Sequence, residues 1–166
     1  MDAQSQDLEK LHQLIKDIQI GMMTTMEKGG WMHSRPMATV NREFDGELWF
    51  FTREHSPKVD EVQQDRHVCV SYASDDRNSY ASVSGRAELV LDKQKMAEMW
   101  NPVYKAWFPK GLEDPEIALL RVKVEKAEYW DMPHSAAVKV FGFAKAVLTG
   151  KPYEPGENKK LDLDRH

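Results

Sequence analysis

Thr52, Ser56 and Lys58 are the residues whose types and spacing are best suited to bind a charged ligand. Ser56-Pro57 is typical of a helix start, with serine as the N-cap and proline in the first turn. The first N–H groups of a helix have no partner within it and attract anions, and Lys58 adds an ammonium. The pattern favours a phosphate dianion here, with Thr52 as a further donor. The alternative is that Ser56 only caps the helix and Lys58 only faces solvent.

Five tryptophans are many for a chain of 166 residues, and three of them stand in polar surroundings. Trp31, Trp107 and Trp130 fit an interface or a flat ligand as well as they fit a protein core, whereas Trp100 falls on an apolar helix face. A planar ligand with a phosphate tail would use both the tryptophans and the helix start.

Other classes of site find less support in the sequence. The six histidines form neither a His-x-His nor a His-Glu-x-x-His motif, so we expect no metal site. A Gly-x-Ser-x-Gly motif and a phosphate-binding glycine loop are missing, and Cys69 lies in an apolar run, where a thiol is usually inert. These observations argue against a hydrolase and against a P-loop nucleotide site.

The composition is that of a soluble domain with a sizeable core. Hydrophobic residues make up 41% of the chain, and the net charge of −4 lacks the basic character of nucleic-acid-binding proteins. No apolar run approaches the roughly 20 residues of a membrane span, and the polar N-terminus is unlike a signal peptide. We therefore expect a cytoplasmic protein with no nucleic-acid or membrane partner.

Strands outnumber helices in the periodicity of the chain. Helices are predicted over 7–19, for about two turns from 57, after Asp92 as an N-cap, and over 135–148. Strands are predicted over 20–26, 31–40, 48–52, 67–73, 79–91 (with a bulge at Gly85), 117–124 and 126–132. Because helices and strands do not alternate, we expect a mainly β, α+β fold with six or seven antiparallel strands in a closed or partly closed barrel. Residues 1–150 form one domain in this interpretation, and 151–166 a flexible charged tail.

Six short motifs, in order along the chain, resemble one known family. They are Ser-Arg-Pro-Met (34–37), Phe-Phe-Thr with Lys58 (50–58), Ser-x-Ser-Gly-x-Ala (82–87), Trp-Phe-Pro-x-Gly (107–111), Glu-Tyr-Trp-Asp (128–131) and Phe-Gly-Phe-Ala-Lys (141–145). This order is similar to that of bacterial general stress proteins of the pyridoxamine 5′-phosphate oxidase-like group, over about residues 6–150. The resemblance implies a split β-barrel that binds FMN and a homodimer with FMN at the subunit interface.

The resemblance also implies which residues contact FMN. Arg35, Pro36 and Met37 would line the isoalloxazine ring, while Phe51, Thr52, Ser56 and Lys58 would hold the ribityl phosphate. Tyr80 stands where the oxidases carry a glutamine that reaches the flavin. Trp130, and with it Trp107, would come from the partner subunit.

The function implied is a small FMN-dependent oxidoreductase of unknown substrate, with no catalytic residue assigned. The alternative is a stress protein that binds, buffers or senses flavin without turnover. The arginine-rich C-terminal signature that grips pyridoxal phosphate is missing after Trp130, so we do not expect vitamin B6 oxidation. Haem or deazaflavin, which this type of barrel also hosts, remain alternative ligands.

Overall fold

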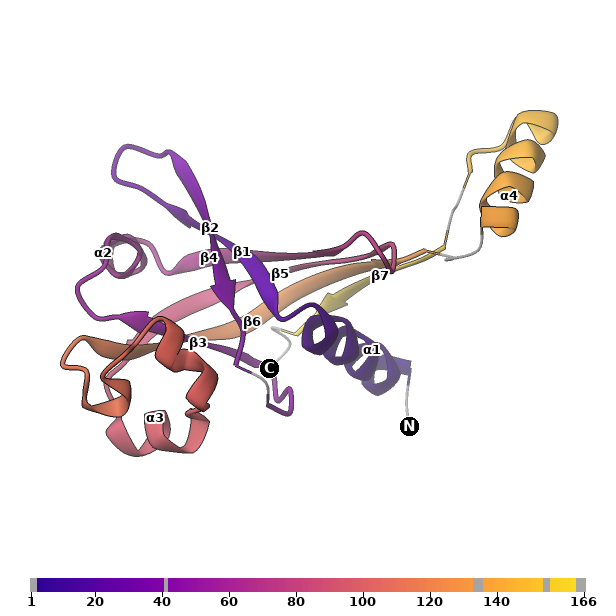
Figure 1. Ribbon diagram of the computed structural model, residues 1–166. Helices are drawn as coiled ribbons and strands as arrows, with labels where there is room; N and C mark the ends of the chain where they lie inside the picture. Colours follow the sequence, from indigo (N-terminus) through magenta and orange to yellow (C-terminus); the bar gives the residue numbers. More distant parts are fainter. Residues whose placement is uncertain (1–2, 41, 133–135, 154–155, 164–166) are drawn as a thin grey trace.

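The computed structural model describes residues 3–40, 42–132, 136–153 and 156–163 (Figure 1). Its elements follow one another along the chain as α1 (Ala3–Ile18), β1 (Ile20–Met26), β2 (Met32–Ala38), β3 (Glu47–Arg53), α2 (Pro57–Gln64), β4 (His67–Ser74), β5 (Ser79–Val90), α3 (Lys93–Met99), η1 (Pro102–Ala106), η2 (Gly111–Glu113), β6 (Ile117–Asp131), α4 (Ala136–Thr149) and β7 (Glu157–Asp162). The strands dominate, as the sequence predicts, and α2 begins at Pro57, as expected.

The strands form one antiparallel sheet in the order β2-β1-β4-β5-β6-β3, with β7 added on β6. The two ends of this order meet where Thr39, after β2, forms a bridge with Phe50 of β3. The amide of Val40 also donates to the carbonyl of Trp49 over 2.8 Å. The sheet therefore curls into a split barrel, and the predicted fold class is confirmed.

The barrel bends where a glycine allows two backbones to approach closely. The pairing of β5 with β6 shifts register between Ser84 and Gly85, so Glu125 of β6 is the extra residue of a bulge. A Cβ atom at Gly85 would lie 2.0 Å from the carbonyl oxygen of Lys123. The predicted bulge is confirmed, but the predicted break in the facing strand is wrong. A bulge absorbs the irregularity at Glu125, and β6 continues for 15 residues.

The core fills the barrel and the space beneath α1. Leu11, Leu14 and Ile15 of α1 are buried with the apolar side chains of the sheet. A second buried cluster lies between β3, β6 and the α3–η2 region, and includes Trp49, Phe108 and Leu119. These two clusters hold β3 and the η1 segment in place relative to β2. Most of the predicted site residues lie on these three segments and at the start of α2.

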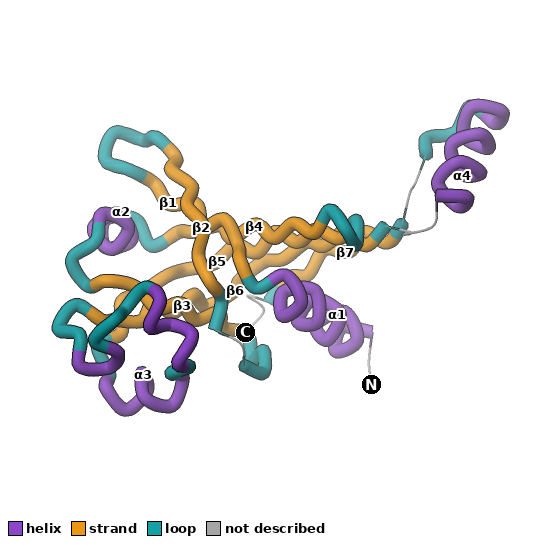
Figure 2. The backbone as a smooth tube through the Cα atoms, in the orientation of Figure 1, coloured by secondary structure: helices purple, strands orange, loops and turns teal. Residues whose placement is uncertain are grey.

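The C-terminal segment differs from the expected loose tail. Residues Glu157–Asp162 form β7, which pairs with Lys126–Asp131 of β6, and Leu161 is buried in the core. The number of charged residues favoured a solvated tail. However, β3 pairs with β6 only up to Lys123, so the backbone of Lys126–Asp131 is available to β7, and the apolar side chain of Leu161 reaches the core. Helix α4 stands apart from the barrel (Figures 1 and 2). No described helix has the length and apolar character needed to cross a membrane.

Candidate functional site

A pocket of about 640 Å³ opens between β2, the end of β3, the start of α2 and the η1 segment. This volume lies within the roughly 300–1,000 Å³ typical of small-molecule sites. Its lining combines cationic, apolar and aromatic side chains: Ile20, Arg35, Pro36, Met37, Ala38, Phe51, Thr52, Arg53, Lys58, Tyr104, Ala106, Trp107 and Phe108. Among the described residues that line it, none is a histidine or a carboxylate.

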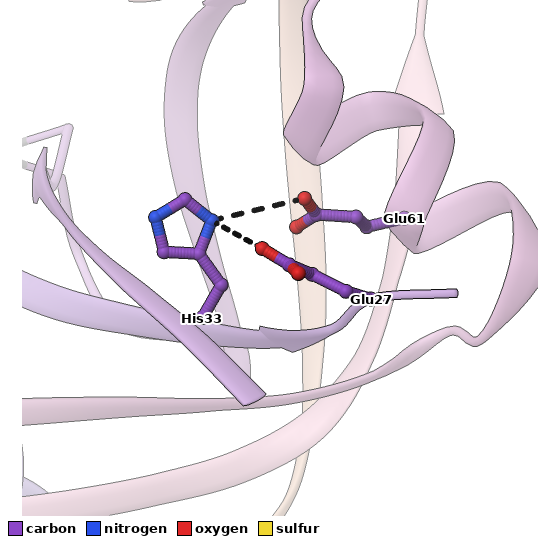
Figure 3. A group of neighbouring side chains, drawn as sticks. All are labelled: Glu27, His33 and Glu61. Carbon is purple, nitrogen blue, oxygen red and sulfur yellow. Dashed lines mark ion pairs between the residues drawn. The ribbon is translucent and has the colours of Figure 1, made fainter. Parts of the chain in front are cut away.

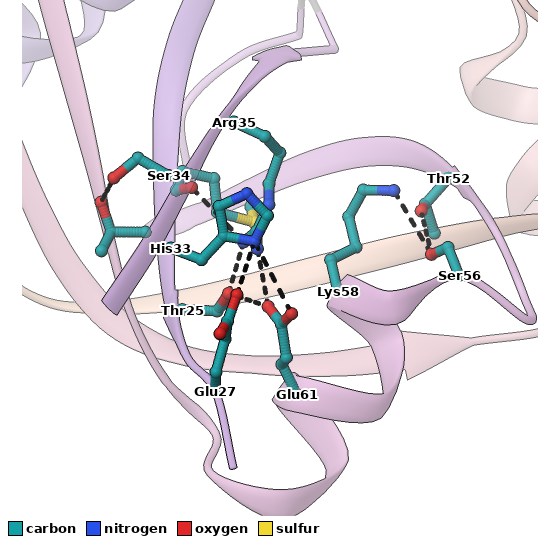
Figure 4. Close-up of polar contacts among 11 residues, drawn as sticks. Thr25, Glu27, His33, Ser34, Arg35, Thr52, Ser56, Lys58 and Glu61 are labelled. Carbon is teal, nitrogen blue, oxygen red and sulfur yellow. Dashed lines mark hydrogen bonds and ion pairs between the residues drawn. The ribbon is translucent and has the colours of Figure 1, made fainter. Parts of the chain in front are cut away.

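The polar corner of the pocket lies where β3 ends and α2 begins (Figure 4). The Ser56 hydroxyl makes no capping bond to the described residues of α2. It lies 3.3 Å from Nζ of Lys58 and 3.5 Å from Oγ1 of Thr52. The sequence left open whether Ser56 only caps the helix. The geometry instead groups its hydroxyl with Thr52 and Lys58, so three polar side chains face one point.

Positive charge accumulates at this corner. Burial lowers the pKa of Lys58, and the nearby guanidinium of Arg35 lowers it further, whereas Glu61 has the opposite effect and Arg53 again lowers it. Arg53 donates to the carbonyl of Trp107 over 3.1 Å, and its guanidinium lies 5.5 Å from the ring centroid of Phe108. Burial and the two guanidinium groups thus disfavour the charged form of Lys58, and an anion beside its ammonium would favour it.

Arg35 is held by a buried carboxylate. Its guanidinium donates to Oε2 of Glu61 over 2.6 Å and also to the Thr25 hydroxyl, which in turn donates to the same carboxylate oxygen. Burial opposes the ionisation of Glu61, but the hydrogen bonds from Thr25 and Arg35 outweigh it, so the pKa of Glu61 is lowered. The ion pair fixes Arg35 and offsets most of its charge, whereas Lys58 and Arg53, the other cations of the lining, form no ion pair with a described residue.

The opposite wall of the pocket is aromatic. Phe51 lies 5.0 Å from Tyr104 and 6.3 Å from Phe108, measured between ring centroids. Trp107 closes the wall with 55% of its surface exposed. Flat, polarisable side chains on one side and cations at one corner match a planar ligand that carries an anionic tail.

The structure brings seven of the ten predicted site residues to this pocket: Arg35, Pro36, Met37, Phe51, Thr52, Lys58 and Trp107. Ser56 adjoins it through Thr52 and Lys58. Tyr80 and Trp130 do not line it. They lie opposite each other on β5 and β6, at the end of the sheet where β7 is added.

Sequence reasoning missed Arg53 and Glu61. Arg53 follows Thr52 directly, so a count of cations near the start of α2 would have included it. Glu61 is a carboxylate between two buried valines of α2, Val59 and Val62. A charged residue at such a position signals a buried partner, although the sequence does not say that this partner is Arg35, 26 residues earlier.

Comparison with known proteins identifies the family of this chain. The family model described as pyridoxamine 5′-phosphate oxidase like matches residues 6–154. Protein bli-3 of Neurospora crassa is 34% identical over an alignment of 157 residues, and the match covers 89% of this chain and 75% of that protein.

Two solved structures extend the comparison. The general stress FMN/FAD binding protein of Xanthomonas citri is 29% identical, with a TM-score of 0.64, and the match covers 74% of this chain and 87% of that one. A Clostridium acetobutylicum protein related to general stress protein 26 has a TM-score of 0.73, with 99% and 98% of the two chains covered. Its 16% identity supports the fold alone. By its sequence and its split barrel, the chain belongs to the pyridoxamine 5′-phosphate oxidase-like family.

Proposed function

We propose that the pocket binds FMN, with the phosphate at the corner formed by Thr52, Arg53, Ser56 and Lys58. The isoalloxazine ring then lies along Arg35–Ala38 of β2. One observation carries this proposal: the Lys58 ammonium and the hydroxyls of Thr52 and Ser56 meet at one end of a pocket that Arg53 also lines and whose other wall is aromatic. The family resemblance points to the same ligand, and the Xanthomonas citri relative is described as FMN/FAD binding.

The donor set fits the charge of a phosphate monoester. Such a group carries about −1.5 to −2 near neutral pH, which matches Lys58 and Arg53 once Glu61 has offset Arg35. The desolvation that lowers the pKa of Lys58 disfavours the charged form of its amino group as long as no anion lies beside it. A phosphate oxygen beside Nζ removes that penalty, so the pocket favours an anion over a neutral ligand.

FMN, when bound, supplies hydride and one-electron chemistry. The chain's own residues bind and orient it. Arg35 directs its N–H groups at Glu61 and Thr25, so it fixes β2 beside α2 and would hold in place the strand along which the ring lies. Phe51, Tyr104 and Phe108 exclude water from the opposite wall. On these grounds we propose a small FMN-dependent oxidoreductase.

One observation favours a second candidate, a protein that binds or buffers flavin without turnover. The described residues that line the pocket include no histidine or carboxylate, so the pocket offers substrate no general acid or base of the usual kind. The two functions differ in whether the bound flavin is reduced and reoxidised at a useful rate.

We further propose a homodimer that completes the site. Tyr80 and Trp130 lie on the far end of the sheet, so they can contact the flavin only from a second copy of the chain. The outer face of β1 and β2, beside the pocket, exposes Ile20, Met22 and Met32, with 47%, 43% and 74% of their surfaces accessible. Apolar side chains in such a group are typical of a surface that a partner covers.

The test begins with the purified full-length protein. A flavin absorption spectrum that survives desalting supports the proposed ligand, whereas a haem spectrum contradicts it. Anaerobic addition of NADH or NADPH, followed by air, then separates the two functions. Bleaching and recovery over repeated cycles support the oxidoreductase, and a flavin that stays oxidised supports the binding protein.

A further inference from the structure

We propose that Glu27, His33 and Glu61 form a binding site for a divalent transition-metal ion of the zinc type, outside the flavin pocket. Glu27 follows the last residue of β1, His33 lies on β2 and Glu61 on α2 (Figure 3). One imidazole nitrogen and two carboxylate oxygens are a ligand set that suits zinc and neighbouring metals. The site goes beyond the proposed flavin chemistry and does not depend on it.

The distances between the three ligand atoms suit one ion. Nδ1 of His33 lies 3.0 Å from Oε1 of Glu27 and 3.9 Å from Oε1 of Glu61. All three ligand atoms lie within 4.8 Å of one another. Ligands bound to zinc at ~2.0–2.2 Å in a tetrahedron are ~3.4 Å apart, a value between the two distances from His33. The two distances from His33 therefore reach the value for a bound ion after shifts of about half an ångström, and a fourth position stays open to water.

Glu61 is prepared to act as a ligand through one oxygen. Its Oε2 accepts hydrogen bonds from Thr25 and Arg35, which orients the carboxylate and leaves Oε1 on the side of His33 (Figure 4). At 3.9 Å, His33 is too far from Oε1 for a hydrogen bond. Partners that hold the second oxygen of a ligand are a regular feature of metal sites, because they fix its direction. The same partners keep Glu61 ionised, as metal binding requires.

Hydrogen bonds of the β1–β2 hairpin hold the backbone that carries the other two ligands. The amide of Glu27 donates to the carbonyl of Trp31 over 2.7 Å, which closes the β1–β2 turn. His33 pairs in register with Thr25, so its ring lies on the same side of the hairpin as the Thr25 hydroxyl that binds Glu61. The β1–β2 hairpin and α2 therefore place the three ligand side chains close together in the folded protein.

The expectation of no metal site rested on motif spacing, which does not reveal this group of residues. His33 is six residues from Glu27 and 28 from Glu61, which matches no linear motif. A proton is the competing occupant, because a protonated His33 can also bridge carboxylates. One Nδ1 proton satisfies only one of the two carboxylates, however, whereas a divalent ion binds both.

Calorimetric titration of the full-length protein with zinc chloride tests the proposal. We expect one ion per chain, and His33→Ala and Glu27→Gln should each weaken binding at least ~10-fold. His55→Ala is the matched control, because Nδ1 of His55 lies 2.9 Å from Oε2 of Glu116 in an exposed pair that forms no group of three among the described residues.

The outcomes are distinct. Loss of affinity in His33→Ala but not in His55→Ala supports the site, and an imidazole signature in the zinc X-ray absorption spectrum would add to it. No stoichiometric binding, or equal loss in both variants, overturns the proposal and assigns the cluster to a proton-bridged ion group. FMN binding is measured separately through its own absorption, so failure of one proposal does not affect the other.

Discussion

Replacing Lys58 with alanine should weaken FMN binding while leaving riboflavin binding almost unchanged. The two ligands share the ring and the ribityl chain and differ only in the phosphate. In the structure, Nζ of Lys58 lies beside Ser56 and lines the pocket with Arg53, so removal of the ammonium leaves one uncompensated cation and two hydroxyls. The variant should therefore lose only part of its affinity for FMN, and only the part that depends on the phosphate.

A hydrogen bond to a charged group contributes about 1.5–3 kcal/mol. At 1.4 kcal/mol for each factor of ten, this loss raises the dissociation constant of FMN about 10- to 140-fold. For riboflavin we expect a change of less than about 2-fold, because the ammonium then has no anion to bind.

Quenching of flavin fluorescence by the flavin-free full-length protein measures both constants. Lys93→Ala is the control, since Lys93 is an exposed lysine at the start of α3, away from the pocket lining. An equal loss of affinity for FMN and riboflavin would show that Lys58 acts on the ring or on the fold. An unchanged FMN constant would exclude Lys58 from the site.

Four further predictions follow from particular contacts. Glu61→Gln leaves Arg35 without its buried counter-charge and should lower the free energy of unfolding by about 3–5 kcal/mol in urea titrations. Because the pKa of Glu61 is lowered in the fold, its contribution is complete above the unfolded pKa and disappears as the pH falls through the folded pKa, so variant and wild type should converge in acid. Gly85→Ala places a methyl group against the Lys123 carbonyl and should cost ~1–3 kcal/mol or more, with the exposed Ser84→Ala as control. FMN binding should raise the pKa of Lys58, so calorimetry at alkaline pH in buffers of different ionisation enthalpy should show proton uptake that Lys58→Met abolishes. Light scattering should give twice 19.2 kDa, and a monomeric mass would remove Trp130 from the proposed flavin site.

The sequence predicted the parts of the fold that local patterns determine. β1 spans the predicted residues, α2 starts at Pro57, and Asp92 accepts the capping bond of α3 from the amide of Lys95. Each of these depends on periodicity or on a cap within a few residues. Such signals do not require knowledge of the rest of the chain.

The features that escaped prediction depend on partners far away in the sequence. β7 forms because the edge of β6 is available for pairing at Lys126–Asp131. The charged residues of 157–162 are untypical of a strand, so the sequence pattern does not indicate one. Glu61 reaches Arg35 across 26 residues, and Glu27 and His33 meet Glu61 only because α2 packs beside the β1–β2 hairpin.

The position of the phosphate decides the central claim most directly. A crystal structure of the protein with FMN should show phosphate oxygens at hydrogen-bond distance, ~2.7–3.2 Å, from Nζ of Lys58 and the hydroxyl of Ser56. A phosphate located elsewhere, or a flavin soak that leaves this corner without density, would contradict the account.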